Sequence, residues 1–126
     1  MSSLNRETSG PVLFHRLSRD ELTLDAKLLE EHGRTARTLV KEGVLRLTLM
    51  GLSSGGVLPE HSAAGPVSIH MLRGDVVFTG PDGEHALSAG DVLVFASGVR
   101  HAARSASGCV FLLTVAHTTP TPAEHG

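Results

Sequence analysis

The chain has 126 residues, which suits one domain burying about two-thirds of the surface that its unfolded form exposes. Its 11 Lys and Arg residues against 13 Asp and Glu residues give a formal net charge of −2, so the whole chain has no electrostatic attraction for nucleic acid or an anionic membrane. With no Trp and no Tyr, it also lacks the usual aromatic platforms for stacking bases or sugars. We therefore expect neither nucleic acid nor a membrane as a partner.

The cysteine content and hydropathy indicate the compartment. The single cysteine, Cys109, excludes an intrachain disulfide, and no apolar run is long enough to span a bilayer. The N-terminus lacks the pattern of a secretory signal, so we expect a cytoplasmic protein. Cys109 precedes the apolar run VFLLTV and is interpreted as a buried small side chain rather than a reactive thiol.

One helix is predicted near the N-terminus. Ser18 followed by Glu21 is a capping-box pattern, and apolar residues then recur at helical spacing. Gly33 provides a C-terminal stop, so the helix is expected over about residues 19–31.

A segment with three cations, residues 34–41, follows the helix and is interpreted as a solvated strand or loop. Arg34 and Arg37 are its weak candidates for contacting an acidic ligand. From Val44 the hydrophobic period changes to two, which is typical of a strand. One face of this strand is expected to carry Leu45, Leu47 and Leu49.

Short strands with frequent turn signals make up the rest of the chain. They are expected at residues 66–73, 76–79, 85–87, 92–95, 102–105 and 110–117. Gly74 and Asp75 are interpreted as a turn, GPDG at residues 80–83 is a hairpin signal, and Pro59 is expected to end the apolar segment before His61. This series predicts an antiparallel sandwich or jelly roll.

Two stretches repeat a spacing of glycine and histidine. The matching residues are Gly55, His61 and Gly74 in the first stretch, and Gly90, Gly98 and His101 in the second. They fit the frames G-x5-H-x-H-x3-E-x6-G and G-x5-P-x-G-x2-H-x3-N, the two motifs of the cupin superfamily. Over roughly residues 43–116 the chain resembles a small single-domain cupin.

The ligand positions of these motifs depart from the cupin pattern. In cupins the first motif supplies two His and one Glu as metal ligands and the second supplies one more His. Here the second His position is Ala63 and the Glu position is Val67. The second motif keeps His101 but has Ala96 and Ser105 at the usual Pro and Asn positions. The resemblance therefore implies a cupin with a degenerate metal-binding motif.

The resemblance implies an all-β fold, an antiparallel jelly-roll barrel, with one N-terminal helix. We divide the chain into an N-terminal arm at residues 1–17, a helix and lead-in strand at residues 18–42, the cupin barrel at residues 43–117 and a polar tail at residues 118–126.

The resemblance also places His61 and His101 together in one mouth of the barrel. Two neutral imidazoles can ligate zinc, iron, nickel or copper, although a catalytic metal site usually has three protein ligands. The cofactor is thus either a transition metal held by an incomplete ligand set or none. The same pair is a candidate for acid–base catalysis. Alternation along the strand turns His70 to the opposite face, and the orientation of His85 is left open.

An apolar pocket for a small organic molecule is expected beside the histidines. Its candidate binding residues are Met50, Val67, Ile69, Met71, Phe78, Phe95 and Phe111. The first functional hypothesis is a cupin-like barrel that binds this molecule with the histidine pair at its mouth. One alternative is an enzyme, either a metal-dependent dioxygenase or isomerase with a reduced ligand set or a metal-free cyclase or isomerase. Another is a non-catalytic sensory or structural dimer module.

A homodimer is expected because the strands carry more apolar surface than one barrel interior can absorb. The residues concerned are Leu45, Leu47, Leu49 and Leu72.

Overall fold

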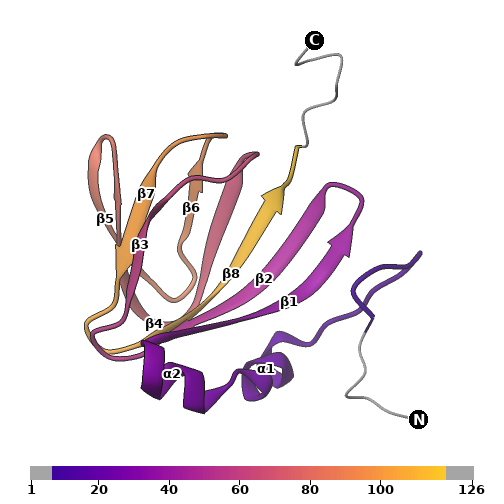
Figure 1. Ribbon diagram of the computed structural model, residues 1–126, viewed down its shortest axis with the longest axis horizontal. Helices are drawn as coiled ribbons and strands as arrows, with labels where there is room; N and C mark the ends of the chain where they lie inside the picture. The colour runs from indigo at the N-terminus through magenta and orange to yellow at the C-terminus, as the bar shows by residue number, and fades with distance from the viewer. Residues whose placement is uncertain (1–6, 119–126) are drawn as a thin grey trace.

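The computed structural model describes residues 7–118, which form a curled antiparallel half-barrel with short N-terminal helices (Figure 1). The helical segments are α1 (Leu17–Asp20), the 3₁₀ turn η1 (Glu21–Thr23) and α2 (Ala26–His32). The strands are β1 (Arg34–Glu42), β2 (Leu45–Leu52), β3 (Val57–His61), β4 (Val67–Gly80), β5 (Gly83–Ser88), β6 (Val92–Phe95), β7 (His101–Arg104) and β8 (Cys109–Ala116). The strand order is β1-β2-β8-β4-β7-β3, with β5 and β6 also paired to β4. The predicted jelly-roll fold is confirmed.

The single helix predicted over residues 19–31 is wrong, because the chain forms three short helical segments instead. The predicted capping box does not form, and Arg16 precedes α1 with no side-chain cap. Leu24 is extended, and Asp25 starts a new helix by accepting hydrogen bonds from two backbone N–H groups at 2.9 and 3.1 Å. Gly33 ends α2 with a φ of 78°, as predicted.

The predicted turn at Gly74 and Asp75 is also wrong, because β4 continues through both residues for 14 residues in all. A register shift between Met71 and Arg73 bends the strand. Its first half pairs with β6 and β8, and its second half pairs with β5 and β7. Gly74 has a φ of 84°, and a Cβ there would collide with the Gly108 carbonyl. The bend therefore carries β4 from one sheet to the other.

Pro59 does not end the segment before His61, because it lies inside β3. This strand is last in the sheet order, and Pro59 falls within a register shift between Leu58 and His61. An edge strand tolerates proline at such a shift because no ladder hydrogen bond needs its missing N–H. The strand thus continues to His61.

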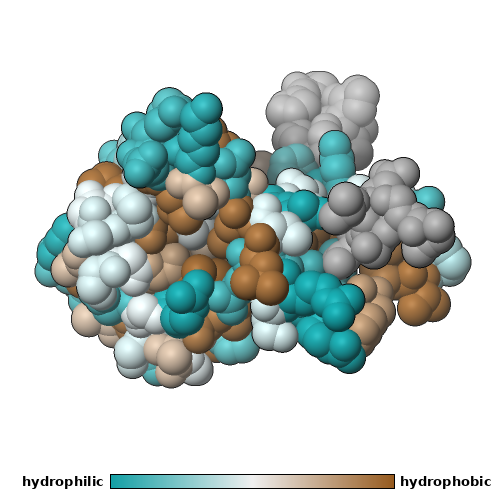
Figure 2. Space-filling view, turned by 90° about the horizontal axis from the view of Figure 1, so that it is seen from below, coloured by the Kyte–Doolittle hydropathy of each residue, from teal (hydrophilic) through white to brown (hydrophobic). Residues whose placement is uncertain are grey.

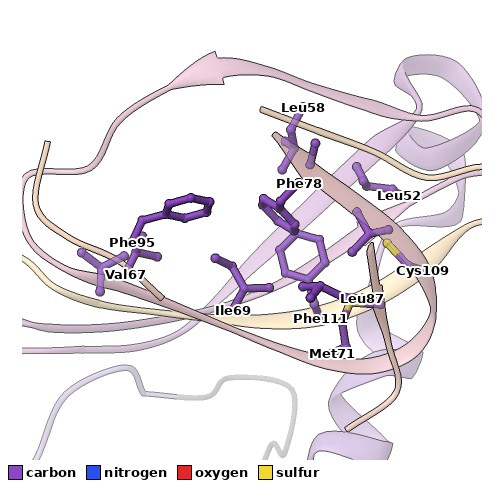
Figure 3. Close-up of a cluster of buried hydrophobic side chains, with 13 residues drawn as sticks. Leu52, Leu58, Val67, Ile69, Met71, Phe78, Leu87, Phe95, Cys109 and Phe111 are labelled. Atoms are coloured by element: carbon purple, nitrogen blue, oxygen red, sulfur yellow. The ribbon is translucent and has the colours of Figure 1, made fainter. Parts of the chain in front are cut away.

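The interior of the half-barrel is filled by one hydrophobic cluster (Figure 3). Its buried members are Leu52, Leu58, Val67, Ile69, Met71, Val76, Phe78, Leu87, Phe95, Ala103, Cys109, Phe111 and Val115. Cys109 is buried as expected, and burial raises the pKa of its thiol. The period-two alternation of β4 explains why Ile69 and Met71 reach this interior while His70 faces the other way.

The outer face of β1, β2 and β8 is covered by the N-terminal segment. In Figure 1, α1 and α2 lie below β1. The outer cluster combines Leu39, Val40, Leu49 and Val110 with partly buried leucines that include Leu13, Leu17, Leu24, Leu47 and Leu72. The chain's own arm and helices therefore cover most of the leucines from which a homodimer was predicted.

The arm before α1 has no regular secondary structure and is anchored to β1. The Gly10 N–H donates to Glu42 Oε1 at 2.8 Å. The His15 ring bridges the carboxylate of Asp20, at 3.1 Å, and the carbonyl oxygen of Leu39, at 3.0 Å. Residues 1–6 of the predicted arm and residues 119–126 of the predicted tail lie outside the described part of the chain.

Several large apolar side chains remain exposed on the arm and the adjoining helical turns. Val12, Phe14 and Leu22 are 83%, 74% and 84% exposed. Figure 2, seen from the side of the helices, shows apolar side chains among hydrophilic ones on this face. A homodimer stays a prediction, with this face as its candidate surface. No helix in residues 7–118 is long and apolar enough to cross a membrane.

Candidate functional site

Strands β3 and β7 bring His61 and His101 together at one end of the half-barrel. The two strands are antiparallel, and these residues are direct partners across them. Their ring centroids are 4.4 Å apart, with an angle of 64° between the ring planes. The expectation that the two motif histidines meet is confirmed.

Both imidazoles are held in the same tautomer by the backbone. His61 Nδ1 lies 2.8 Å from the carbonyl oxygen of Pro59, and His101 Nδ1 lies 2.9 Å from that of Val99. A carbonyl oxygen can only accept a hydrogen bond, so Nδ1 is the protonated nitrogen in each neutral ring. Within residues 7–118 neither Nε2 has a hydrogen-bond partner. Each ring therefore offers an Nε2 lone pair to a ligand.

The two histidines differ sharply in burial. His61 is exposed, whereas His101 is 2% exposed. Phe95 stacks on the His101 ring at 4.5 Å with only 3° between the planes, and Phe78 lies 6.3 Å away. Every fully buried side-chain nitrogen and oxygen in the described chain has a hydrogen-bond partner. Because Nε2 of His101 has none, it belongs to the small part of the ring that solvent reaches.

This environment keeps His101 neutral. Burial lowers the pKa of His101 most strongly, because the imidazolium loses its hydration. The hydrogen bond to Val99 raises that pKa, and the neighbouring His61 lowers it. The net direction is downward, so at neutral pH His101 presents a lone pair rather than a positive charge.

Comparison with known proteins identifies the family. The Cupin domain family matches residues 48–115, which is more than half of the chain. The chain belongs to the cupin domain family. No curated protein matches it.

Solved structures share the fold of this cupin. A conserved protein of unknown function from Streptococcus pyogenes is 25% identical, with a TM-score of 0.64 over 73% of this chain and 85% of that one. A cupin superfamily protein from Desulfitobacterium hafniense is 20% identical, with a TM-score of 0.65 over 68% and 78%. Salicylate 1,2-dioxygenase from Pseudoaminobacter salicylatoxidans is 17% identical, with a TM-score of 0.74 over 90% of this chain but 35% of that one. The last two likenesses establish the fold alone.

The residues at the mouth of this cupin do not fit the metal-ligand set of its family. Where that set has a second histidine and a glutamate, Ala63 packs against the interior cluster and Val67 is 2% exposed. Among residues 7–118 no three side chains of His, Cys, Asp or Glu are grouped so that they could hold a metal ion. The degenerate motif is confirmed. Metal binding by His61 and His101 alone stays a prediction.

Neither of the other two histidines considered for the site completes it. His70 alternates with the buried residues of β4 and lies on the opposite face, as predicted. His85 lies beside Phe78 in the β4–β5 pairing, but its Nε2 contacts the Asp82 carboxylate at 3.1 and 3.0 Å. This contact lowers the pKa of Asp82. The His85 ring is therefore held by Asp82 in the β4–β5 hairpin and does not join the histidine pair.

Ser105, at the usual Asn position, has a structural role. It is 2% exposed, donates to the Asp75 carbonyl at 2.6 Å and accepts from the Gly108 N–H at 2.9 Å. The first bond ties the end of β7 to β4, and the second joins Ser105 to the loop before β8. Glu60 pairs with Arg100 at 3.1 Å in an exposed contact. Neither side chain serves the histidine pair.

The predicted ligand-binding residues form the packed interior next to the histidines. Val67, Ile69, Met71, Phe78, Phe95 and Phe111 are 0–6% exposed, and Figure 3 shows them pointing into one cluster. Met50 is partly buried and packs against this cluster. Phe95 and Phe78 lie beside the His101 ring, and the motif spacing did not predict either contact. Ligand contact by these residues stays a prediction.

Proposed function

We propose that this cupin binds a small organic molecule that carries a hydroxyl or N–H group, with the histidine pair as its polar anchor. The observation that supports this proposal is the shared tautomer of His61 and His101, which leaves an Nε2 acceptor on each ring. An acceptor pair selects a ligand with a hydrogen-bond donor. Beside the pair, Ala63 is apolar and only partly buried, so the body of the ligand is proposed to lie against it.

Proton transfer is the second candidate function, because His101 is neutral and nearly buried. A neutral imidazole with a free Nε2 can act as a general base, and burial keeps it in that form. The reaction class is a metal-free isomerisation or cyclisation in which Nε2 removes a proton and returns it elsewhere on the same molecule. This reading needs no third ligand.

The test is thermal unfolding of the full chain with matched probe pairs, phenol against anisole and benzyl alcohol against benzyl methyl ether. The first member of each pair has an O–H donor, and the second has none. At about one hundred times its dissociation constant a ligand adds about 2.7 kcal/mol to the free energy of unfolding. We expect stabilisation by the alcohols and phenols that is lost in His61→Ala, His101→Ala.

His70→Ala is the matched control, because His70 faces away from the pair. It should keep the response of the wild type. Equal stabilisation by both members of each probe pair, or stabilisation retained by the double variant, would refute the proposed anchor. Turnover of a true substrate by the double variant would refute the general-base reading. A dimer without any ligand response would favour the structural module.

A further inference from the structure

A cavity that is lined by neither His61 nor His101 lies where α2 meets β1 and β2. Its volume is about 470 Å³, within the range of small-molecule sites. The residues that line it are Leu28, His32, Arg34, Thr35, Ala36 and Met50.

The cavity lies beside β1, which is an edge strand of the sheet. Strands β1 and β3 are the two ends of the sheet order and do not pair with each other. The Arg34 guanidinium spans the gap with one long hydrogen bond, from Nη1 to the Val57 carbonyl at 3.4 Å. The pairing of β1 with β2 sets Ala36 opposite Met50 and keeps Arg34 on the same face. Their side chains therefore border the same opening.

Arg34 gives the lining a positive charge, and the lining contains neither Asp nor Glu. Three other arginines, Arg73, Arg100 and Arg104, are each paired with a glutamate at 2.8–3.1 Å. In the described part of the chain Arg34 has no carboxylate partner. Most of its guanidinium donors are therefore available to a ligand.

We propose that this cavity binds a small carboxylic acid. The planar guanidinium of Arg34 matches a carboxylate with two parallel hydrogen bonds. Leu28, 39% exposed, and the partly buried Met50 provide apolar walls for the rest of the molecule. The site is distinct from the proposed histidine anchor, because neither His61 nor His101 lines the cavity.

The test is a two-dimensional amide NMR titration of the full chain with benzoate and hexanoate. Benzamide and hexanamide are the uncharged probes of matching shape. We expect the acids, but not the amides, to shift signals of residues 28–36 and 50. Arg34→Gln should weaken binding by about tenfold or more, and Arg34→Lys should weaken it less, because lysine keeps the charge but loses the fork.

Arg37→Gln is the control, because Arg37 lies on the other face of β1 and its replacement removes the same charge. It should bind benzoate like the wild type, and so should His61→Ala, His101→Ala. The proposal would be overturned if acids and amides caused equal shifts, or if Arg37→Gln weakened benzoate binding as much as Arg34→Gln. It would also be overturned if about 10 mM acid, ten times a millimolar dissociation constant, caused no shift. If Arg34→Gln does not fold, Arg34→Lys is used instead. The proposal is then overturned if Arg34→Lys binds benzoate like the wild type and the amides shift the same signals as the acids.

Discussion

Replacing Phe95 with leucine should raise the pKa of His101 and destabilise the domain. Phe95 is 6% exposed and covers one face of the His101 ring at 4.5 Å. Leucine is apolar but cannot cover a planar ring, so water reaches His101 and hydrates its charged form. We expect unfolding to become easier by about 1–2 kcal/mol, less than the about 3–5 kcal/mol typical of replacing a buried Phe with Ala.

The pKa is measured from the Cε1–H NMR signal of His101 as the pH is varied, and stability from urea unfolding. Phe111→Leu is the matched control, because Phe111 is 0% exposed and packs edge-on against Phe78 rather than on the histidine. It should lose similar stability without changing the His101 titration. An unchanged titration in Phe95→Leu, or an equal rise in both variants, would show that the stack does not cause the lowered pKa.

Three further predictions follow from the same geometry. Because the folded-state pKa of His101 is lowered, stability should be full above the ordinary histidine pKa of about 6.5 and fall as the pH drops through the range between that value and the folded pKa. The melting temperature of His101→Gln should therefore fall less on acidification, and a steeper fall would contradict this. Ala63→His should create a three-histidine site that binds zinc by calorimetry, whereas Ala63→His, His61→Ala should not; no gain over wild type would show that the mouth is not shaped for a metal. Gly74→Ala should cost about 2–4 kcal/mol in urea unfolding, because its Cβ would meet the Gly108 carbonyl, and wild-type stability would refute the tight bend.

Strand faces were predictable because burial of one face imposes a period of two along the chain. In β4, Ile69 and Met71 are buried while Ser68 and His70 are only partly covered, as the alternation predicts. The hairpin after β4 was predictable for a local reason as well. Gly80 and Gly83 pair across the two residues between them, Pro81 and Asp82, which favour a tight turn.

The errors occurred where a local signal competes with distant packing. Gly74 followed by Asp75 is typical of a turn, but pairing of Gly74 with Cys109 across β4 and β8 keeps the strand extended. In the helical segment, Leu24 packs into the outer cluster, and the helix restarts at Asp25. Cys109 is far from Gly74 in the sequence, and the strand residues that pack with Leu24, such as Leu49, are far from Leu24. Local patterns could therefore not reveal either outcome.

The candidate site was predictable only in part. Motif spacing placed His61 and His101 together, but it contains no information on the carbonyls that fix their tautomers. The stack of Phe95 on His101 depends on how β6 and β7 pack in space. For Arg34 the sequence shows a charge, whereas the structure shows that no carboxylate within residues 7–118 pairs with it, unlike Arg73, Arg100 and Arg104.

Ala63 and Val67 offer a ligand different chemistry from the His and Glu of the cupin motif. A glutamate would bring a negative charge that stabilises a bound cation, but Val67 stands at that position and is buried. The two imidazoles then remain as acceptors, and burial keeps the His101 ring uncharged. In an apolar setting an unpaired acceptor is costly to cover, so a ligand that supplies a donor gains over one of similar shape that does not. The same reasoning favours a charged ligand in the Arg34 cavity, because an uncharged ligand would leave the guanidinium without a counterion. The two proposals thus assign different ligands to one small barrel, a neutral donor to the histidine pair and a carboxylate to the cavity at Arg34.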